Sequence, residues 1–130
     1  DGDGDIDAED IKMLSEDDAR YIAKKIFWDY FRADFILNQS VAEFIVDWGY
    51  HSGRKTVAKI VQRVLKVTID GIVGAQTLAA INCADQEKLF DQLKSERTVF
   101  LENIVKRRPD QMVFYRGWMN RLKAFKYNPA

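Results

Sequence analysis

Cysteine is almost absent from the chain, and long apolar runs are missing altogether. Cys83 is the single cysteine among 130 residues, so no internal disulfide can form and packing has to stabilise the fold. No segment approaches the roughly 18 to 20 consecutive apolar residues of a membrane span, and no signal peptide is visible at the start. We therefore expect a soluble globular body. Cys83 is expected to be a small buried residue rather than a nucleophile, because nothing places it near His51, the only histidine.

The alternation of apolar and polar residues that marks a half-buried strand is also missing. Apolar residues recur instead at spacings of three and four, and 47% of the chain is hydrophobic, which is ample for one core. Capping patterns open several of these segments: Ser40 is followed by Glu43, and Asp85 precedes a long amphipathic run that Pro109 ends. The sequence predicts a single all-α domain with about six helices.

Residues 66–77 form a connector between two segments with helical periodicity. Asp70 and Gly71 are a turn dipeptide, because glycine takes positive φ at no steric cost, and Gly74 supplies a second permissive position. Ile69, Ile72 and Val73 are too apolar for a free loop. We expect this connector to be a structural hinge that inserts into the core.

Charge is balanced overall but unevenly spread along the chain. Residues 1–50 carry a net charge of −8 and residues 51–130 a net charge of +8. The basic part could face a polyanion, either nucleic acid or an anionic wall polymer. Because the charges are scattered along helices at spacings that suit solvated faces, we do not expect a nucleic-acid partner.

The first ten residues resemble a calcium loop with its beginning missing. Gly4 takes the place of the glycine at the sharp bend, and Ile6 the place of the apolar residue that follows. The candidate calcium ligands are Asp1, Asp3, Asp5, Asp7 and Asp10. In this alignment the first ligand would precede Asp1, so upstream polypeptide is expected. The alternative is an acidic head that caps the next helix through the helix dipole.

One helix end combines polar chemistry with a permissive backbone. Asp47, Tyr50 and His51 lie just before Gly53, and exposed helix ends of this composition commonly line a cleft. The alternative is a simple break between two helices. Trp28, earlier in the chain, and its aromatic neighbours are assigned mostly to the core, although one of them could stack on a sugar ring.

Several motifs resemble known cell-wall proteins. Residues 62–67, the Asp70 to Gly74 turn and the Thr77-Leu78 pair look like the signature of predicted peptidoglycan-binding segments. Together with residues 47–53 and the Gly117-Trp118-x-Asn120-Arg121 run, the chain is similar to the C-terminal two thirds of glycoside hydrolase family 108. These proteins are lysozyme-like N-acetylmuramidases, also described as secretion activators.

The resemblance implies a domain division and a set of site residues. Residues 1–14 form the truncated calcium-like segment with a short helix, and 15–130 form a lysozyme-like helical domain whose peptidoglycan-binding-like part covers about 54–126. The family's catalytic glutamate lies in an E-G-G-Y motif that this chain lacks, so the acid is expected upstream and the chain alone is expected to be inactive. The residues expected to contact saccharide are Asp47, Tyr50, His51 and Trp118. Asp47 could instead be a structural acid paired to Arg121.

The implied activity of the intact protein is hydrolysis of the β-1,4 bond after N-acetylmuramic acid. A partly desolvated glutamic acid protonates the leaving oxygen, while a carboxylate or water supports the cation-like sugar. The alternative is a non-catalytic peptidoglycan-binding or interaction module. Either way the expected partner is the peptidoglycan glycan strand, no cofactor beyond possible calcium is expected to be required, and we expect a monomer. It is expected to come from a bacterium or prophage and to act at the periplasm or cell wall.

Overall fold

The computed structural model describes residues 16–129, and all regular secondary structure in this range is helical. The predicted all-α class with about six helices is therefore confirmed. The candidate calcium ligands between Asp1 and Asp10 lie outside the described residues. The elements are α2 (Glu16–Tyr30), the 3-10 turn η1 (Ala33–Phe35), α3 (Gln39–Ser52), α4 (Arg54–Leu65), α5 (Ala75–Cys83), α6 (Gln86–Arg107), the 3-10 turn η2 (Pro109–Gln111) and α7 (Met112–Ala124).

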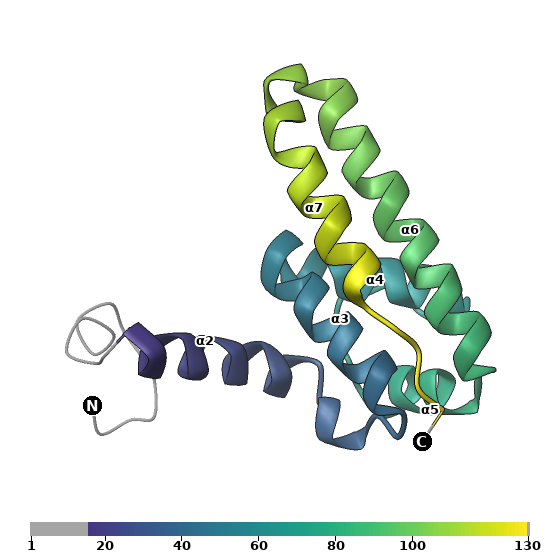
Figure 1. Ribbon diagram of the computed structural model, residues 1–130. Helices are drawn as coiled ribbons and strands as arrows, with labels where there is room; N and C mark the ends of the chain where they lie inside the picture. The colour runs from purple at the N-terminus through teal and green to yellow at the C-terminus, as the bar shows by residue number, and fades with distance from the viewer. Residues whose placement is uncertain (1–15, 130) are drawn as a thin grey trace.

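Helix α3 lies at the centre of the fold and contacts α2, α4 and α6 (Figure 1). Helices α6 and α7 pair as a long hairpin, and its far end, the η2 turn, projects beyond the body formed by α3, α4 and α5. Helix α2 extends from the body in a different direction. The cavity described below lies where α2, α3 and α7 meet.

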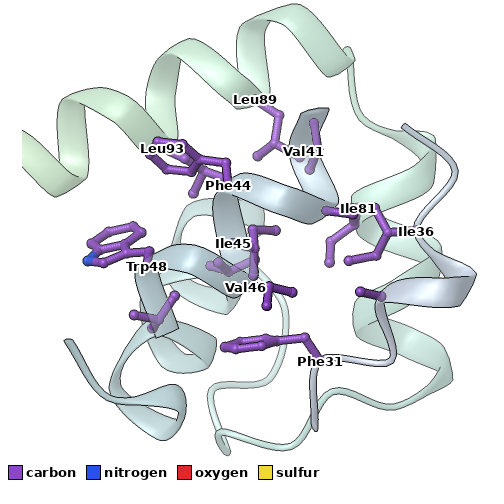
Figure 2. Close-up of a cluster of buried hydrophobic side chains, with 14 of the residues drawn as sticks. Phe31, Ile36, Val41, Phe44, Ile45, Val46, Trp48, Ile81, Leu89 and Leu93 are labelled. Atoms are coloured by element: carbon purple, nitrogen blue, oxygen red, sulfur yellow. The ribbon is translucent and has the colours of Figure 1, made fainter. Parts of the chain in front are cut away.

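The central position of α3 follows from its sequence, which is apolar around most of its circumference. Phe44 and Trp48 are fully buried on one side, facing α6, and Ile45 is buried beside them (Figure 2). Phe44 makes edge-on or tilted contacts with Trp48, Phe90 and other rings of the core. Burying one large apolar side chain contributes roughly 1.5–3 kcal/mol, so these side chains of α3 make a large contribution to the packing energy.

The cap residue of α6 is the one predicted from the sequence, whereas the cap residue of α3 is not. Asp85 accepts a hydrogen bond from the Lys88 amide at 3.1 Å, as a helix cap should. At α3 the cap is Asn38, whose side chain accepts from the Val41 amide at 3.0 Å, and not Ser40 as predicted. The Ser40 hydroxyl instead accepts a hydrogen bond from the Asn128 amide at 2.8 Å. Ser40 thus ties the segment after α7 to the start of α3.

The connector after α4 is organised by one buried amide, that of Gln62. Its oxygen accepts hydrogen bonds from the amides of Asp70 and Gly71, at 3.0 and 2.9 Å. Its nitrogen lies within hydrogen-bond distance of Asp70 Oδ1, the Ile72 carbonyl and Thr77 Oγ1. Gly71 has φ of +76°, which confirms the predicted turn.

The expected burial of the connector is correct only in part, and the expected burial of Cys83 is wrong. Only Val73 of the connector's apolar residues enters the core, whereas Ile69 and Ile72 are 52% and 67% exposed. The turn that Gln62 holds fixes the directions of these side chains, and a single buried residue suffices to anchor it. Cys83 is also exposed rather than buried, because it lies at the last position of α5, past the face that packs on the core.

We expect opposite stability effects from two Gly→Ala substitutions within helices. A Cβ on Gly49 would overlap the ring of Phe31, which is itself buried, so Gly49→Ala should lower the free energy of unfolding by about 1–3 kcal/mol. A Cβ on Gly117 would meet nothing within 4 Å, so Gly117→Ala should raise it by about 0.5–1 kcal/mol. Urea denaturation measures both, and equal effects would contradict the close contact at Gly49.

Candidate functional site

A cavity of about 630 Å³ lies among the three helices α2, α3 and α7. Both polar and aromatic side chains line it; its two cations come from α2 and α7, and its three carboxylates come from η1 and α3. Such a concave surface with several convergent polar groups is the usual form of a ligand site. Its lining residues are Tyr21, Lys25, Trp28, Asp34, Glu43, Val46, Asp47, Tyr50, Arg121 and Phe125.

The floor of the cavity contains a carboxylate held by several cationic groups. Asp47, on α3, accepts hydrogen bonds from Arg97 Nη2 of α6 at 3.2 Å and from Arg121 Nε of α7 at 3.2 Å. A second nitrogen of Arg121 bonds the other carboxylate oxygen, so this pair is bidentate. His51 Nε2 lies 3.6 Å from Asp47 Oδ1, one helical turn away. One side chain of α3 therefore joins α6 and α7.

The electrostatics keep Asp47 ionised. Burial by itself would raise the pKa of Asp47, but the hydrogen bond and charge of Arg121, with the charges of Arg97 and His51, outweigh it and hold the pKa below the ordinary 3.8. Burial lowers the pKa of Arg97, and the bond to Asp47 raises that of Arg121. A carboxyl group in this state cannot hold a proton for donation near neutral pH. Asp47 is thus a fixed negative charge. Its pairing with Arg121 was one of the two hypotheses that the sequence suggested for it.

The aromatic wall of the cavity is built from α2 and α3. Tyr50 packs edge-on against Phe27, with ring centroids 5.4 Å apart, and remains partly exposed. Trp28 donates its indole hydrogen to Asp34 Oδ1 at 2.8 Å, which fixes the orientation of its ring. The cavity is therefore bordered by two oriented aromatic rings next to polar groups.

The remaining two carboxylates of the cavity lie in solvent. Asp34 and Glu43 are both exposed, and Glu43 accepts a hydrogen bond from the side-chain amide of Gln39 at 3.0 Å. A glycosidase acid needs a desolvated environment that favours its protonated form. Neither residue has that environment, and Asp47 is ionised by its partners.

The structure brings together part of the predicted site. Asp47 and Tyr50 line the cavity, and His51 lies beside Asp47 with its ring edge-on to Tyr50. Trp118 is not among the lining residues; it stacks on Phe114, farther along α7 toward the hairpin end. The expected contact of these residues with saccharide stays a prediction.

Sequence reasoning missed the contribution of α2 to this site. Tyr21, Lys25 and Trp28 all line the cavity, and their spacing of four and three places them on one face of the helix. The pairing of Arg97 with Asp47 was also missed, because it spans 50 positions of the chain.

Within residues 16–129, no group of three His, Cys, Asp or Glu side chains lies close enough together to hold a metal ion. None of the helices in this same range combines the length and the apolar character that crossing a bilayer requires.

Comparison with known proteins places the chain in a family. A family model described as a predicted peptidoglycan domain matches residues 56–123. Among solved structures, that of SagA from Brucella abortus is similar, with a TM-score of 0.72 and 27% sequence identity over 91% of this chain. The chain spans 65% of the SagA chain, and no curated protein matches it. The chain therefore belongs to the predicted peptidoglycan domain family, and its role is related to peptidoglycan.

Proposed function

We propose that the cavity among α2, α3 and α7 binds a peptidoglycan glycan strand. We further propose that the chain is the glycan-binding part of a lysozyme-type N-acetylmuramidase. The observation that carries this proposal is the combination of two oriented aromatic rings, Trp28 and Tyr50, with a fixed pair of charges, Asp47 and Arg121, in one cavity. Family membership supports peptidoglycan as the polymer.

The chemistry of the lining suits a sugar polymer. The faces of pyranose rings are apolar and pack on aromatic side chains, while their hydroxyl and N-acetyl groups need hydrogen-bond partners. Tyr50 and Trp28 offer the first kind of contact. Arg121 has donors beyond those that bind Asp47, and Lys25 adds another cation at the rim.

The same lining argues against catalysis by the described residues alone. Hydrolysis of the glycosidic bond requires a protonated acid beside the leaving oxygen. Asp47 is held ionised, and Asp34 and Glu43 are exposed. In our proposal the acid is the glutamate of an E-G-G-Y segment, which is not part of these residues, and the cavity described here positions the strand for it.

Truncating Tyr50 is expected to weaken binding to the wall polymer. We expect the chain to co-sediment with purified peptidoglycan, and Tyr50→Ala to lower its apparent affinity about fivefold or more, because the aromatic face is lost. Phe35→Ala removes an exposed ring on η1 that does not line the cavity, and should bind as the parent chain does. Failure of the parent chain to bind, or equal binding by both variants, would overturn the proposed site.

A turbidity-clearing assay separates the muramidase from the binding module. The 130-residue chain is expected not to clear suspensions of purified cell walls, whereas a version extended by an E-G-G-Y segment should clear them. Clearing by the short chain would show that its own carboxylates suffice. If the extended version binds walls without clearing them, the protein is a non-catalytic binding module. The geometry of the cavity is equally consistent with that function.

A further inference from the structure

The far end of the α6–α7 hairpin carries apolar side chains that nothing in the described structure covers. Met112, Val113 and Phe114, in the first turn of α7, are 57%, 76% and 53% exposed. They are consecutive, so they point in different directions around the helix and give the end of the hairpin an apolar surface. Only Phe114 has a ring partner in this group, since it stacks on Trp118. We call Met112, Val113 and Phe114 the apolar tip.

Cations surround the apolar tip. Lys106 and Arg107 end α6, Arg108 follows just before the η2 turn, and Arg116 lies one turn into α7; all four are exposed. The only carboxylate between residues 106 and 116 is Asp110, which lies 3.9 Å from Arg108 in a solvent-exposed pair. Exposed pairs of this kind are weak, so the end of the hairpin keeps a clear positive charge.

We infer that the end of the hairpin docks on the surface of an anionic lipid bilayer. Exposed apolar side chains beside lysine and arginine match the two layers of such a surface, because the cations meet the lipid phosphates and the apolar groups enter the acyl boundary. The hairpin also projects beyond the rest of the fold, so its end can reach a flat surface without a clash from α3, α4 or α5 (Figure 1).

Charge complementarity favours this occupant over two others. A second copy of the chain docking tip to tip would bring like charges together, four cations on each side. A soluble polyanion would satisfy the cations and leave the apolar tip in water. The inference does not depend on the proposed function, because the cavity lies at the opposite end of α7, at Arg121 and Phe125.

Vesicle co-sedimentation of the whole chain tests the inference. At low salt we expect binding to vesicles of phosphatidylglycerol and phosphatidylcholine in equal amounts, and little binding to phosphatidylcholine alone. The basic variant Lys106→Gln/Arg107→Gln should lower the partition coefficient by at least about tenfold, since each cation near an anionic membrane contributes on the order of 1 kcal/mol. The apolar variant Met112→Ser/Val113→Ser should lower it about fivefold or more, because it removes the inserted groups.

Two matched controls make the same chemical changes elsewhere on the surface. Lys59→Gln/Lys123→Gln removes two exposed cations, and Leu37→Ser/Ile69→Ser removes two exposed apolar side chains. All the substituted residues are exposed, so the variants should fold, which circular dichroism checks. The controls should partition as the parent chain does.

Several results would overturn the inference. One is the absence of binding to the anionic vesicles, and another is equal weakening by the tip variants and their controls. A third is weakening by the basic variant alone, which would mean that the hairpin binds polyanions without inserting. A fourth is a dimer in sedimentation velocity that Met112→Ser/Val113→Ser disperses, which would assign the tip to a second copy of the chain.

Discussion

Replacing Asp47 with asparagine is expected to lower the free energy of unfolding at neutral pH by about 3 kcal/mol or more. The substitution keeps the size of the side chain but removes its charge. Arg97, 5% exposed at its side chain, is then a buried cation without a counter-charge, and Arg121 loses its bidentate partner. Urea denaturation followed by circular dichroism measures the loss.

A matched substitution tests whether burial is the cause. Asp29→Asn removes the partner of Lys25 in an exposed pair at 3.5 Å, and it should change stability by no more than about 0.5 kcal/mol. Adding Arg97→Met to Asp47→Asn should recover part of the loss, because the buried charge is removed as well. If Asp47→Asn and Asp29→Asn have equal effects, the buried cluster around Asp47 contributes no more to stability than an exposed ion pair does.

The contribution of Asp47 should depend on pH in a defined direction. Its pKa in the folded protein lies below the ordinary 3.8, so the unfolded chain binds a proton at Asp47 more readily than the folded chain does. The stabilisation is therefore fully present above that ordinary pKa and is lost as the pH falls through the lower folded pKa. We expect the stability difference between the parent chain and Asp47→Asn to be constant near neutral pH and to shrink below about pH 4.

Replacing Gln62 with leucine is the second change with a large expected effect, a loss of at least about 2 kcal/mol. Leucine is similar in size but has no hydrogen-bonding groups. The amides of Asp70 and Gly71 would lose their acceptor, and Thr77 Oγ1 would lose a buried partner. Each buried polar group left unsatisfied costs about 1–3 kcal/mol.

Gln76→Leu is the control for this substitution, because Gln76 is exposed on the neighbouring helix α5. It should change stability by less than about 0.5 kcal/mol. Amide hydrogen exchange adds a local readout: in Gln62→Leu the amides of Asp70 and Gly71 should exchange faster than in the parent chain. Unchanged exchange at these two amides would show that Gln62 does not hold the turn.

Local features of the fold could be predicted from the sequence, and directions of side chains could not. The periodicity of apolar residues placed the helices, and Asp85 was correctly identified as a cap, because both depend on neighbours in the chain. Ser40 was wrong as the cap of α3, since its hydroxyl is used by Asn128, far along the chain. Ile72 is exposed because the turn held by Gln62 directs it outward, which its hydrophobicity alone does not reveal.

The sequence predicted the residues that α3 contributes to the candidate site, but not those of α2. Asp47 and Tyr50 share a helix end, so their common surface followed from spacing alone. The face of α2 that completes the cavity depends on the angle between two helices, which no local pattern contains. The family model begins at residue 56, so the residues that α2 and α3 contribute to the cavity lie before the segment that defines the family.

Helix α7 has a further consequence, because its two ends belong to different surfaces. Met112 is at the end of the hairpin, and Arg121 lies nine residues later in the cavity. With a rise of 1.5 Å per residue, an unbroken helix holds these two points about 14 Å apart along its axis. The helix thus acts as a spacer of fixed length. A ligand in the cavity and a surface at the apolar tip would therefore be held at a set separation from each other.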